Sequence, residues 1–484
     1  MADGGARRDS SGELSGDLGS LTTCPVTGAG ATPPLSPQPR KMGTTSQSSE
    51  GPVTFDSPQL HRNRGRSFGG SSRGAASPTP SLSKRGEEPV YYHDYLCLDK
   101  LLSAQVPKSA APGVNGRAEW GDGAAHDEHL FIVIHQVYEL WFKQILHELN
   151  SVVEVFSSSY VDEKDVGIAV ARMKRVTEIQ RIVVSQLSVL ETMTPMGFLE
   201  FRDFLFPASG FQSVQFRLIE NTLGLKNDMR KKYGQRSYCT YLKEHHREVV
   251  LRAEHVSLHD LVEKWLERTP FLSVGDFNFW THYQRAVDAM LDADRQFIET
   301  DESIPEAERA KMLDEVEQRR SSYEQLVDGE KYNERKARGE HRLSHRAMQA
   351  ALLISLYQDE PILQPANALL QSLLDVDNLL TQWRHRHALM VHRMLGVKIG
   401  TGGSSGYHYL RATASQHRIF TDLFNIATFL VPRDSLPPLP GNIEELMRFR
   451  LPATGAGDEE SAPANVNAAF VACMESPDGD AISD

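Results

Sequence analysis

Residues 129–156 read HLFIVIHQVYELWFKQILHELNSVVEVF. Apolar side chains recur in this stretch at intervals of three and four residues, the spacing of one face of an α-helix. They also fill many of the remaining positions, so little of the helix surface is polar. A helix that is apolar nearly all round is typical of the core of a large protein. The stretch therefore predicts a long buried helix within an all-α fold.

Helical spacing continues over most of residues 90–451, whereas the alternating pattern of strands is scarce. Residues 304–342 are dense in charge and poor in large apolar residues after Val316, so we predict a solvated helical excursion there. No internal repeat is visible, and residues 89–452 are expected to form one domain. The further predicted helices are 163–193, 197–206, 258–268, 277–299, 305–327, 345–357, 365–395 and 414–429.

The two ends of the chain differ from this region in composition. Residues 1–88 are rich in Ser, Gly, Pro and Thr, and Phe55 and Phe68 are their only Phe, Tyr or Trp residues. Residues 453–484 hold seven acidic residues and no Lys or Arg. Segments with so little apolar surface cannot offset the entropy lost on ordering. We therefore predict that both ends are disordered, and that the C-terminal one is an acidic tail.

Composition excludes several classes of protein. Among 484 residues, 64 acidic and 52 basic side chains give a net charge of −12, which argues against a nucleic-acid binder. The four cysteines form no C-x-x-C pair, which argues against a disulfide-stapled secreted chain and a cysteine-built zinc site. The first residues lack the apolar run of a signal peptide, and no stretch approaches the roughly 18 apolar residues of a membrane span. We expect a cytoplasmic protein with neither nucleic acid nor membrane as a partner.

The 18 histidines allow a metal or haem site, but the common metal motifs are missing. No Glu is followed by a His three residues later, which is the pair that holds two metals in helical bundles. The H-E-x-x-H motif of zinc proteases is also absent. His126 and His129 flank two acidic residues and could place two imidazoles one turn apart. The same four residues also suit the polar first turn of a helix.

His387 lies on the apolar stripe of the helix predicted at residues 365–395, whereas His385 and His392 are rotated away from it. Two interpretations are open. One is a core histidine with a satisfied hydrogen bond, and the other is a haem axial ligand held against an apolar wall. The rest of the stripe consists of Leu373, Leu380, Trp383, Met390, Val391 and Met394.

Three further segments allow both a functional and a structural interpretation. Residues 400–406, GTGGSSG, could wrap closely around a ligand or serve as a flexible linker, and they lack the Lys-Ser/Thr pair of a phosphate-binding loop. Phe131 and His135 share one face of the first helix, where core packing also explains them. Arg202 follows two phenylalanines and could pair with a carboxylate or cap the surface.

Together these segments resemble the tryptophan 2,3-dioxygenase family. The matching segments occur in the family's order and cover nearly all of residues 90–440. Each is weak alone, but the ordered set is specific. The departures lie at the two ends, in residues 304–342 and at the least demanding positions of residues 91–93. The segments are residues 92–105, 126–131, 135–136, 138–143, 201–204, 207–213, 265–270, 277–280, 392–396 and 400–411.

The resemblance implies a single helical haem domain of the tryptophan/indoleamine dioxygenase type. It implies heme b as the cofactor, ferrous in the active state, and a homotetramer built as a dimer of dimers. His387 takes the position of the proximal iron ligand. Arg217 takes that of the arginine that meets a haem propionate.

The resemblance also assigns a substrate pocket. His135 takes the distal catalytic position, where its imidazole accepts a hydrogen bond from the indole N–H. Arg202 would hold the substrate carboxylate, and Thr401 its ammonium and carboxylate end. The remaining pocket members are Phe131 and Phe198 against the indole, Ser209 on the distal side, and Tyr92, Tyr95 and Leu96, which complete the neighbouring subunit's pocket.

The implied reaction opens the C2–C3 bond of the indole ring of L-tryptophan with O2. Both oxygen atoms enter N-formyl-L-kynurenine, in the first step of tryptophan catabolism by the kynurenine pathway. The alternative class is a haem-binding regulator or helical scaffold that kept the fold without turnover. The joint presence of Phe131, His135, Arg202 and Thr401 favours the enzyme, because a scaffold needs none of these side chains together.

Overall fold

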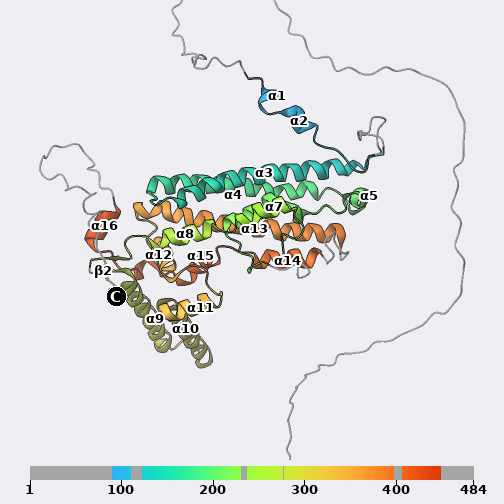
Figure 1. The fold of residues 1–484 in the computed structure, drawn as a ribbon. Helices are drawn as coiled ribbons and strands as arrows, with labels where there is room; N and C mark the ends of the chain where they lie inside the picture. The colour runs from blue at the N-terminus through green and yellow to red at the C-terminus, as the bar shows by residue number, and fades with distance from the viewer. Residues whose placement is uncertain (1–89, 111–122, 231–236, 276, 397–405, 449–484) are drawn as a thin grey trace, which may run out of the picture. The chain divides into compact units, whose positions relative to one another are not determined.

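The helix predicted at residues 129–156 is α3, His126–Ser157. The structure is a computed structural model that describes residues 90–110, 123–230, 237–275, 277–396 and 406–448. Helix α3 packs along α4 (Glu163–Leu190), and α4 packs along α13 (Gln364–Leu395) (Figure 1). These three long helices contribute to one large cluster of buried apolar side chains.

Burial in α3 is confined to one face. Leu140, on another side of the helix, is 48% exposed although the sequence around it is apolar. The prediction of a core helix is confirmed for the face that meets α4, while apolar residues on the other faces stay partly accessible. The buried apolar residues of α3 are Ile134, Tyr138, Phe142, Ile145, Leu149, Val152 and Phe156.

The remaining described elements are shorter helices, one strand pair and two more helices of 22 residues each, α9 and α10. In chain order they are α1 (Tyr92–Tyr95), α2 (Leu98–Leu102), α5 (Pro195–Phe201), η1 (Arg202–Leu205), η2 (Gly210–Gln212), α6 (Val214–Leu223), α7 (Glu244–Arg252), α8 (Leu258–Glu267), β1 (Ser273–Val274), β2 (Phe277–Asn278), α9 (Phe279–Thr300), α10 (Glu306–Val327), α11 (Gly329–Ala337), α12 (His345–Leu356), η3 (Pro361–Leu363), α14 (Gly406–Gln416), α15 (Thr421–Asn425), η4 (Ile426–Phe429), η5 (Arg433–Ser435) and α16 (Gly441–Met447).

Most predicted helices are present, and their first residues explain where several begin. Asp162 accepts a hydrogen bond from the backbone N–H of Asp165 at the start of α4, and Ser257 and Ser344 do the same for α8 and α12. The helix predicted from residue 277 begins at Phe279, because Phe277 and Asn278 pair with β1 as an antiparallel strand. Helices α1, α2, α6, α7 and α16 were not predicted.

The single helix predicted at residues 414–429 is wrong. Helix α14 ends at Gln416 and α15 begins at Thr421, so the chain turns between them. The buried carboxylate of Asp377 accepts hydrogen bonds from the backbone N–H groups of Ile419 (3.0 Å) and Phe420 (3.1 Å). A tertiary contact therefore takes over donors that a continuous helix would use internally.

The charged segment 304–342 is helical, as predicted, but it is not isolated from the rest of the chain. Helix α10 packs on α9, and ion pairs connect their surfaces, including Arg320 with Asp292 at 2.6 Å and Arg319 with Asp294 at 2.9 Å. Surface pairs of this kind contribute little stability, about 0 to 1 kcal/mol each. The buried side chains of α10, which are Val316, Tyr323 and Leu326, are its apolar anchors.

The predictions of disorder for residues 1–88 and 453–484 fall outside the described residues. Within the described ranges, no single helix is long and apolar enough to cross a membrane. One bent pair, made of Glu163–Leu190 and Pro195–Leu205, passes the same test by length and composition, with an angle of 90° between its halves.

Candidate active site

His387 lies in the C-terminal half of α13, against an aromatic wall. Its ring stacks on Trp383 with 5.0 Å between centroids and 17° between planes. Burial lowers the pKa of His387 to about 4, so the imidazole is neutral at neutral pH. Within the described part of the chain, the structure gives this imidazole no hydrogen-bond partner. A neutral imidazole with an uncommitted lone pair is the form that binds a metal.

His135 lies on α3. Its Nδ1 is 2.7 Å from the backbone carbonyl of Phe131, so Nδ1 carries the proton and donates it to that oxygen. This bond leaves the lone pair on Nε2 as an acceptor. Burial lowers the pKa of His135, although its side chain keeps an exposed surface. Dense surroundings combined with exposure are expected of a side chain that lines a cavity.

The imidazoles of His387 and His135 lie near each other. After burial, the second cause that lowers the pKa of His387 is the charge of His135. Such an interaction requires that the two imidazoles lie near one another, although they come from helices more than 200 residues apart in the sequence. The structure therefore brings the predicted proximal and distal histidines to one region.

Aromatic rings border His135. Phe131 contacts the His135 ring at 4.1 Å between centroids, and Phe198 lies 5.9 Å from Phe131. Phe201 is fully buried and contacts both phenylalanines at 5.4 Å. Helix α5 ends at Phe201, and the half-buried Arg202 begins η1 immediately afterwards. The predicted residues Phe131 and Phe198 thus meet at the His135 end of α3, and Arg202 follows Phe201 directly in the chain.

Ser209 caps the short helix η2. Its hydroxyl accepts a hydrogen bond from Phe211 N, and its backbone N–H donates one to Oε1 of Gln212. Phe211 contacts Tyr409 of α14 at 5.4 Å, so this turn lies beside the helix that follows the glycine-rich segment. Thr401, in that segment, lies outside the described residues.

The chain matches the sequence profile of the family described as tryptophan 2,3-dioxygenase over residues 79–430. It is 50% identical over 362 residues to a tryptophan 2,3-dioxygenase of Bdellovibrio bacteriovorus, covering 75% of this chain and 98% of that protein. It is 46% identical over 373 residues to one of Dictyostelium discoideum, covering 76% and 91%, respectively. The chain belongs to the tryptophan 2,3-dioxygenase family. The resemblance and the prediction of an enzyme of the oxidoreductase class are thereby confirmed.

The N-terminal residues predicted to complete a tryptophan 2,3-dioxygenase pocket are exposed here. Tyr92, Tyr95 and Leu96 are 70%, 74% and 40% exposed, and α1 and α2 contain no buried residue. Their connection to α3 is nevertheless fixed, because Gln105 donates to Gln136 at 2.6 Å, one residue after His135. The segment of residues 92–105 therefore ends beside His135, while the side chains of Tyr92 and Tyr95 are exposed.

Arg217 of α6 is buried and bonds to Glu220 at 2.7 Å. Its guanidinium carbon lies 5.6 Å from the centre of the Phe216 ring, and Phe216 contacts Trp383 at 5.1 Å. Sequence reasoning missed Glu220 and the other arginines that surround it. The only sequence signal was the Arg217–Glu220 pair at helical spacing, which many solvated helices share.

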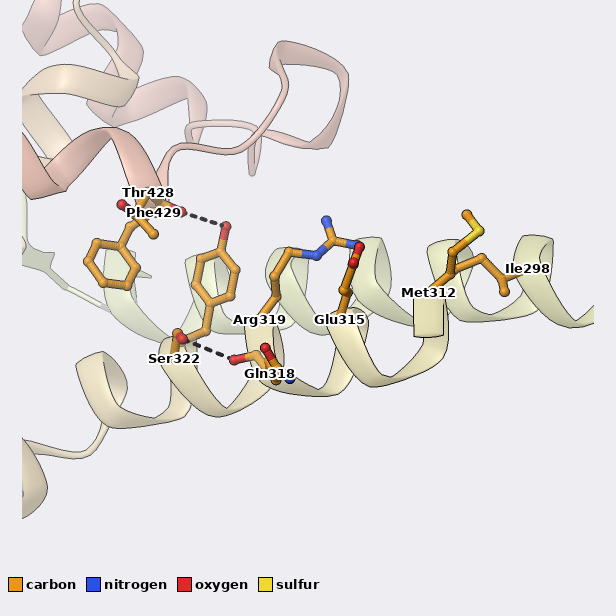
Figure 2. Close-up of a pocket in the computed structure, with 9 residues that line it drawn as sticks. Ile298, Met312, Glu315, Gln318, Arg319, Ser322, Thr428 and Phe429 are labelled. Carbon is orange, nitrogen blue, oxygen red and sulfur yellow. Dashed lines mark hydrogen bonds between the residues drawn. The ribbon is translucent and has the colours of Figure 1, made fainter. Parts of the chain in front are cut away.

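The predicted site residues line neither of two pockets in the described part of this chain. A pocket of about 450 Å³ lies between α10 and the η4 segment, and Figure 2 shows Thr428 and Phe429 on one side and the α10 side chains on the other. It has no contact with the predicted site. Its lining consists of Ile298, Met312, Glu315, Gln318, Arg319, Ser322, Tyr323, Thr428 and Phe429.

Proposed function

We propose that this protein is a haem-dependent dioxygenase that converts L-tryptophan and O2 to N-formyl-L-kynurenine. The observation that carries the proposal is the family match, together with His387 and His135, whose imidazoles lie near one another in the fold. His387 offers a neutral imidazole without a described partner, and His135 offers an acceptor nitrogen beside an aromatic wall. The neutral imidazole of His387 suits a metal, and the acceptor nitrogen of His135 suits the N–H group of an indole.

The described residues fit heme b. His387 would bind the iron, since its imidazole is neutral, buried against Trp383 and uncommitted. Arg217 would meet a propionate, and its buried Nε has no described partner. When bound, ferrous haem supplies the chemistry that activates O2, and the protein supplies position and a dry cavity.

His135 would orient the substrate rather than remove a proton from it. Its Nδ1 is committed to Phe131, so Nε2 would accept the hydrogen bond of the indole N–H. The lowered pKa keeps the ring neutral and therefore able to accept. Phe131 and Phe198 would pack on the indole through their faces and edges, as aromatic rings prefer.

The polar end of the substrate would be held by Arg202 and Thr401, with Ser209 on the distal side. An arginine binds a carboxylate through two parallel N–H···O bonds, which fixes orientation as well as affinity. We further propose that the protein is a cytoplasmic homotetramer, arranged as a dimer of dimers. In that assembly Tyr92, Tyr95 and Leu96 would close the pocket of the adjacent subunit.

The visible spectrum of the purified protein, followed by aerobic addition of L-tryptophan, separates this function from the alternative. A dioxygenase should show a Soret band and accumulate N-formyl-L-kynurenine. A haem-binding regulator or scaffold would show the band without product.

Replacing His135 by Ala should leave haem content unchanged and reduce kcat/KM only partly. One hydrogen bond contributes about 0.5 to 1.5 kcal/mol, which corresponds to a roughly 2- to 12-fold loss. His147→Ala, at an exposed position of the same helix, is the control and should match the parent. Steady-state kinetics with haem quantification makes the comparison, and a haem-free His135→Ala protein would contradict the distal placement.

Removing residues 1–85 together with residues 453–484 should leave haem content, tetramer mass and turnover nearly unchanged. We propose that these ends flank the catalytic domain of residues 89–452 and contribute nothing to its pocket. Extending the N-terminal cut through residue 97 removes Tyr92, Tyr95 and Leu96, and activity should then fall sharply while haem remains. The test compares the activity and the size-exclusion mass of the two truncated proteins. A steep loss after the shorter cut would give the ends a function, and equal activity after both cuts would exclude the pocket shared between subunits.

A further inference from the structure

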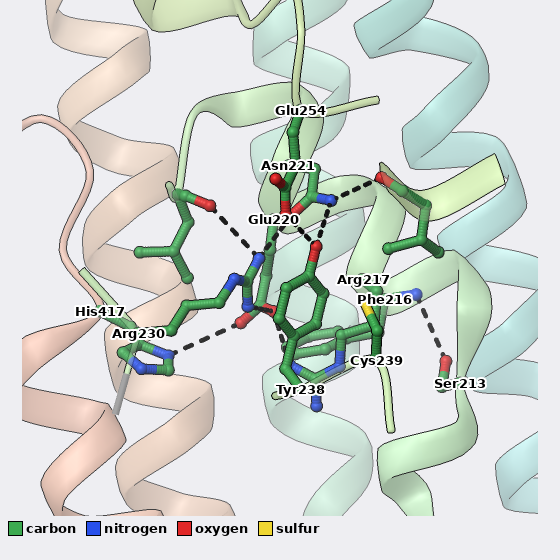
Figure 3. A network of polar contacts seen from close by, with 12 residues as sticks. Ser213, Phe216, Arg217, Glu220, Asn221, Arg230, Tyr238, Cys239, Glu254 and His417 are labelled. Atoms are coloured by element: carbon green, nitrogen blue, oxygen red, sulfur yellow. Dashed lines mark hydrogen bonds and ion pairs between the residues drawn. The ribbon is translucent and has the colours of Figure 1, made fainter. Parts of the chain in front are cut away.

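A cluster of buried charged residues surrounds Glu220 of α6 (Figure 3). Glu220 Oε2 accepts hydrogen bonds from Arg217 Nη1 at 2.7 Å and Arg230 Nη1 at 2.6 Å. Its Oε1 accepts one from Arg384 Nη2 at 2.9 Å. Burial alone would raise the pKa of Glu220, but the guanidinium groups hold it well below its usual range. We call these four residues the Glu220 cluster.

The Glu220 cluster carries more positive than negative charge. Three guanidinium groups share one carboxylate, and all four side chains are more than nine-tenths buried. Two further carboxylates have hydrogen bonds of their own: Glu254 accepts one from the Tyr238 hydroxyl, and Asp377 accepts two from backbone N–H groups while also interacting with the charge of Arg384. Among the described residues, Nε of Arg217 and Nε of Arg230 have no hydrogen-bond acceptor. A buried surplus of positive charge and donors is costly unless an anion binds to it.

The cluster connects to His387 by two routes. Arg384 precedes His387 by three residues on α13, so Glu220 fastens that turn of α13 to α6. Arg217 lies against Phe216, whose ring contacts Trp383, and Trp383 stacks on His387. Both routes lead from one carboxylate to the aromatic wall behind the imidazole.

Arg230 is held differently. Its guanidinium carbon lies 4.1 Å from the centre of the Tyr238 ring, and Nη2 donates to Asn221 at 2.5 Å. Arg217 and Arg230 thus bind the same carboxylate oxygen at nearly equal distances, and only Arg217 is described in contact with the wall that leads to His387. This difference provides a matched pair for experiment.

We propose that Glu220 is a positioning residue of the cofactor site. It fixes the turn of α13 that carries His387, through Arg384, and it holds Arg217 where this arginine pairs with a carboxylate of the cofactor. The inference rests on the proposed haem function. Glu220 would contact neither iron nor substrate. It would nevertheless affect how tightly the cofactor is bound and the potential at which its iron is reduced.

The first test compares Glu220→Gln with Glu148→Gln in the haem-loaded protein. Glu148 is as deeply buried and pairs with Arg175 at 2.9 Å, but it joins α3 to α4. Haem transfer to excess apomyoglobin should be at least tenfold faster for Glu220→Gln than for the parent. The ferric/ferrous midpoint potential should rise, because loss of a nearby negative charge favours the reduced iron. Glu148→Gln should match the parent in both measurements. Equal values for the two variants would overturn the proposal.

The second test compares substitutions of Arg217 and Arg230, so that the proposal can still be refuted if Glu220→Gln does not fold. Arg217→Gln should accelerate haem transfer to apomyoglobin, whereas Arg230→Gln should lower the thermal stability of the protein without accelerating transfer. Equal acceleration by both variants would reduce the cluster to a structural role. Because neither readout involves turnover, a parent protein that binds haem but does not oxidise tryptophan would contradict only the proposed function.

Discussion

Replacing His387 by Ala should abolish stable haem binding, and with it the Soret band and all activity. His387 is the one described histidine on the apolar stripe of α13, and its imidazole is neutral and uncommitted. No other described side chain on this wall offers a nitrogen in that state, so the iron would lose its protein ligand. The measurement is haem content per protein by pyridine haemochrome, with the Soret band of the same sample.

His392→Ala is the matched control for that substitution. His392 lies on the same helix, is exposed and stacks on Tyr407 at 4.2 Å, so its loss should leave haem content intact. Free imidazole should restore a Soret band to His387→Gly by occupying the space that the side chain leaves. A normal spectrum and activity in His387→Ala would refute the ligand assignment and make His392 the next candidate.

Replacing Arg202 by Ala should weaken L-tryptophan binding roughly tenfold to a hundredfold. A charge-assisted bidentate pair is worth about 1.5 to 3 kcal/mol in a site shielded from water. Tryptamine keeps the indole and the ammonium group but lacks the carboxylate, so its affinity should hardly change. Titration of both ligands into the haem-loaded protein, followed by the Soret shift, measures the two losses.

Arg181→Ala serves as the control for Arg202, because Arg181 lies exposed on α4 and pairs with Glu178. It should bind both ligands as the parent does. If Arg202→Ala weakened tryptophan and tryptamine equally, Arg202 would serve the structure of the α5–η1 turn instead of the substrate carboxylate.

The fold could be predicted where burial depends on apolar periodicity alone. Helices α3 and α13 have continuous apolar faces, so their residues indicate both their presence and their buried sides. Helix α6 was missed because its inner face buries Arg217, Glu220 and Asn221, which interrupt the apolar pattern. Helix α7 buries only Val250. The break between α14 and α15 depends on Asp377, which is distant in sequence and therefore invisible to local patterns.

Less of the candidate site than of the fold could be predicted from the residues alone. Periodicity placed His387 on an apolar face, and on spacing alone a core histidine was the favoured interpretation over a haem ligand. Only the fold shows that its imidazole lacks a described partner and interacts with His135. The Glu220 cluster could not be predicted, because Arg384 is remote from α6 in the sequence and reaches Glu220 only after folding. The family motif, rather than spacing, supplied the assignments of Arg202, Ser209 and Thr401.

The central claim is that the haem-loaded protein inserts both atoms of O2 into L-tryptophan. The most direct measurement incubates the ferrous protein with L-tryptophan and 18O-labelled oxygen gas, and follows oxygen uptake, tryptophan loss and product mass together. We predict equal amounts of oxygen and tryptophan consumed, without an external reductant, and N-formyl-L-kynurenine that carries the label at both new oxygen positions. Haem-loaded protein that consumes no oxygen with L-tryptophan, or a product in which one new oxygen comes from water before any exchange, would contradict the claim.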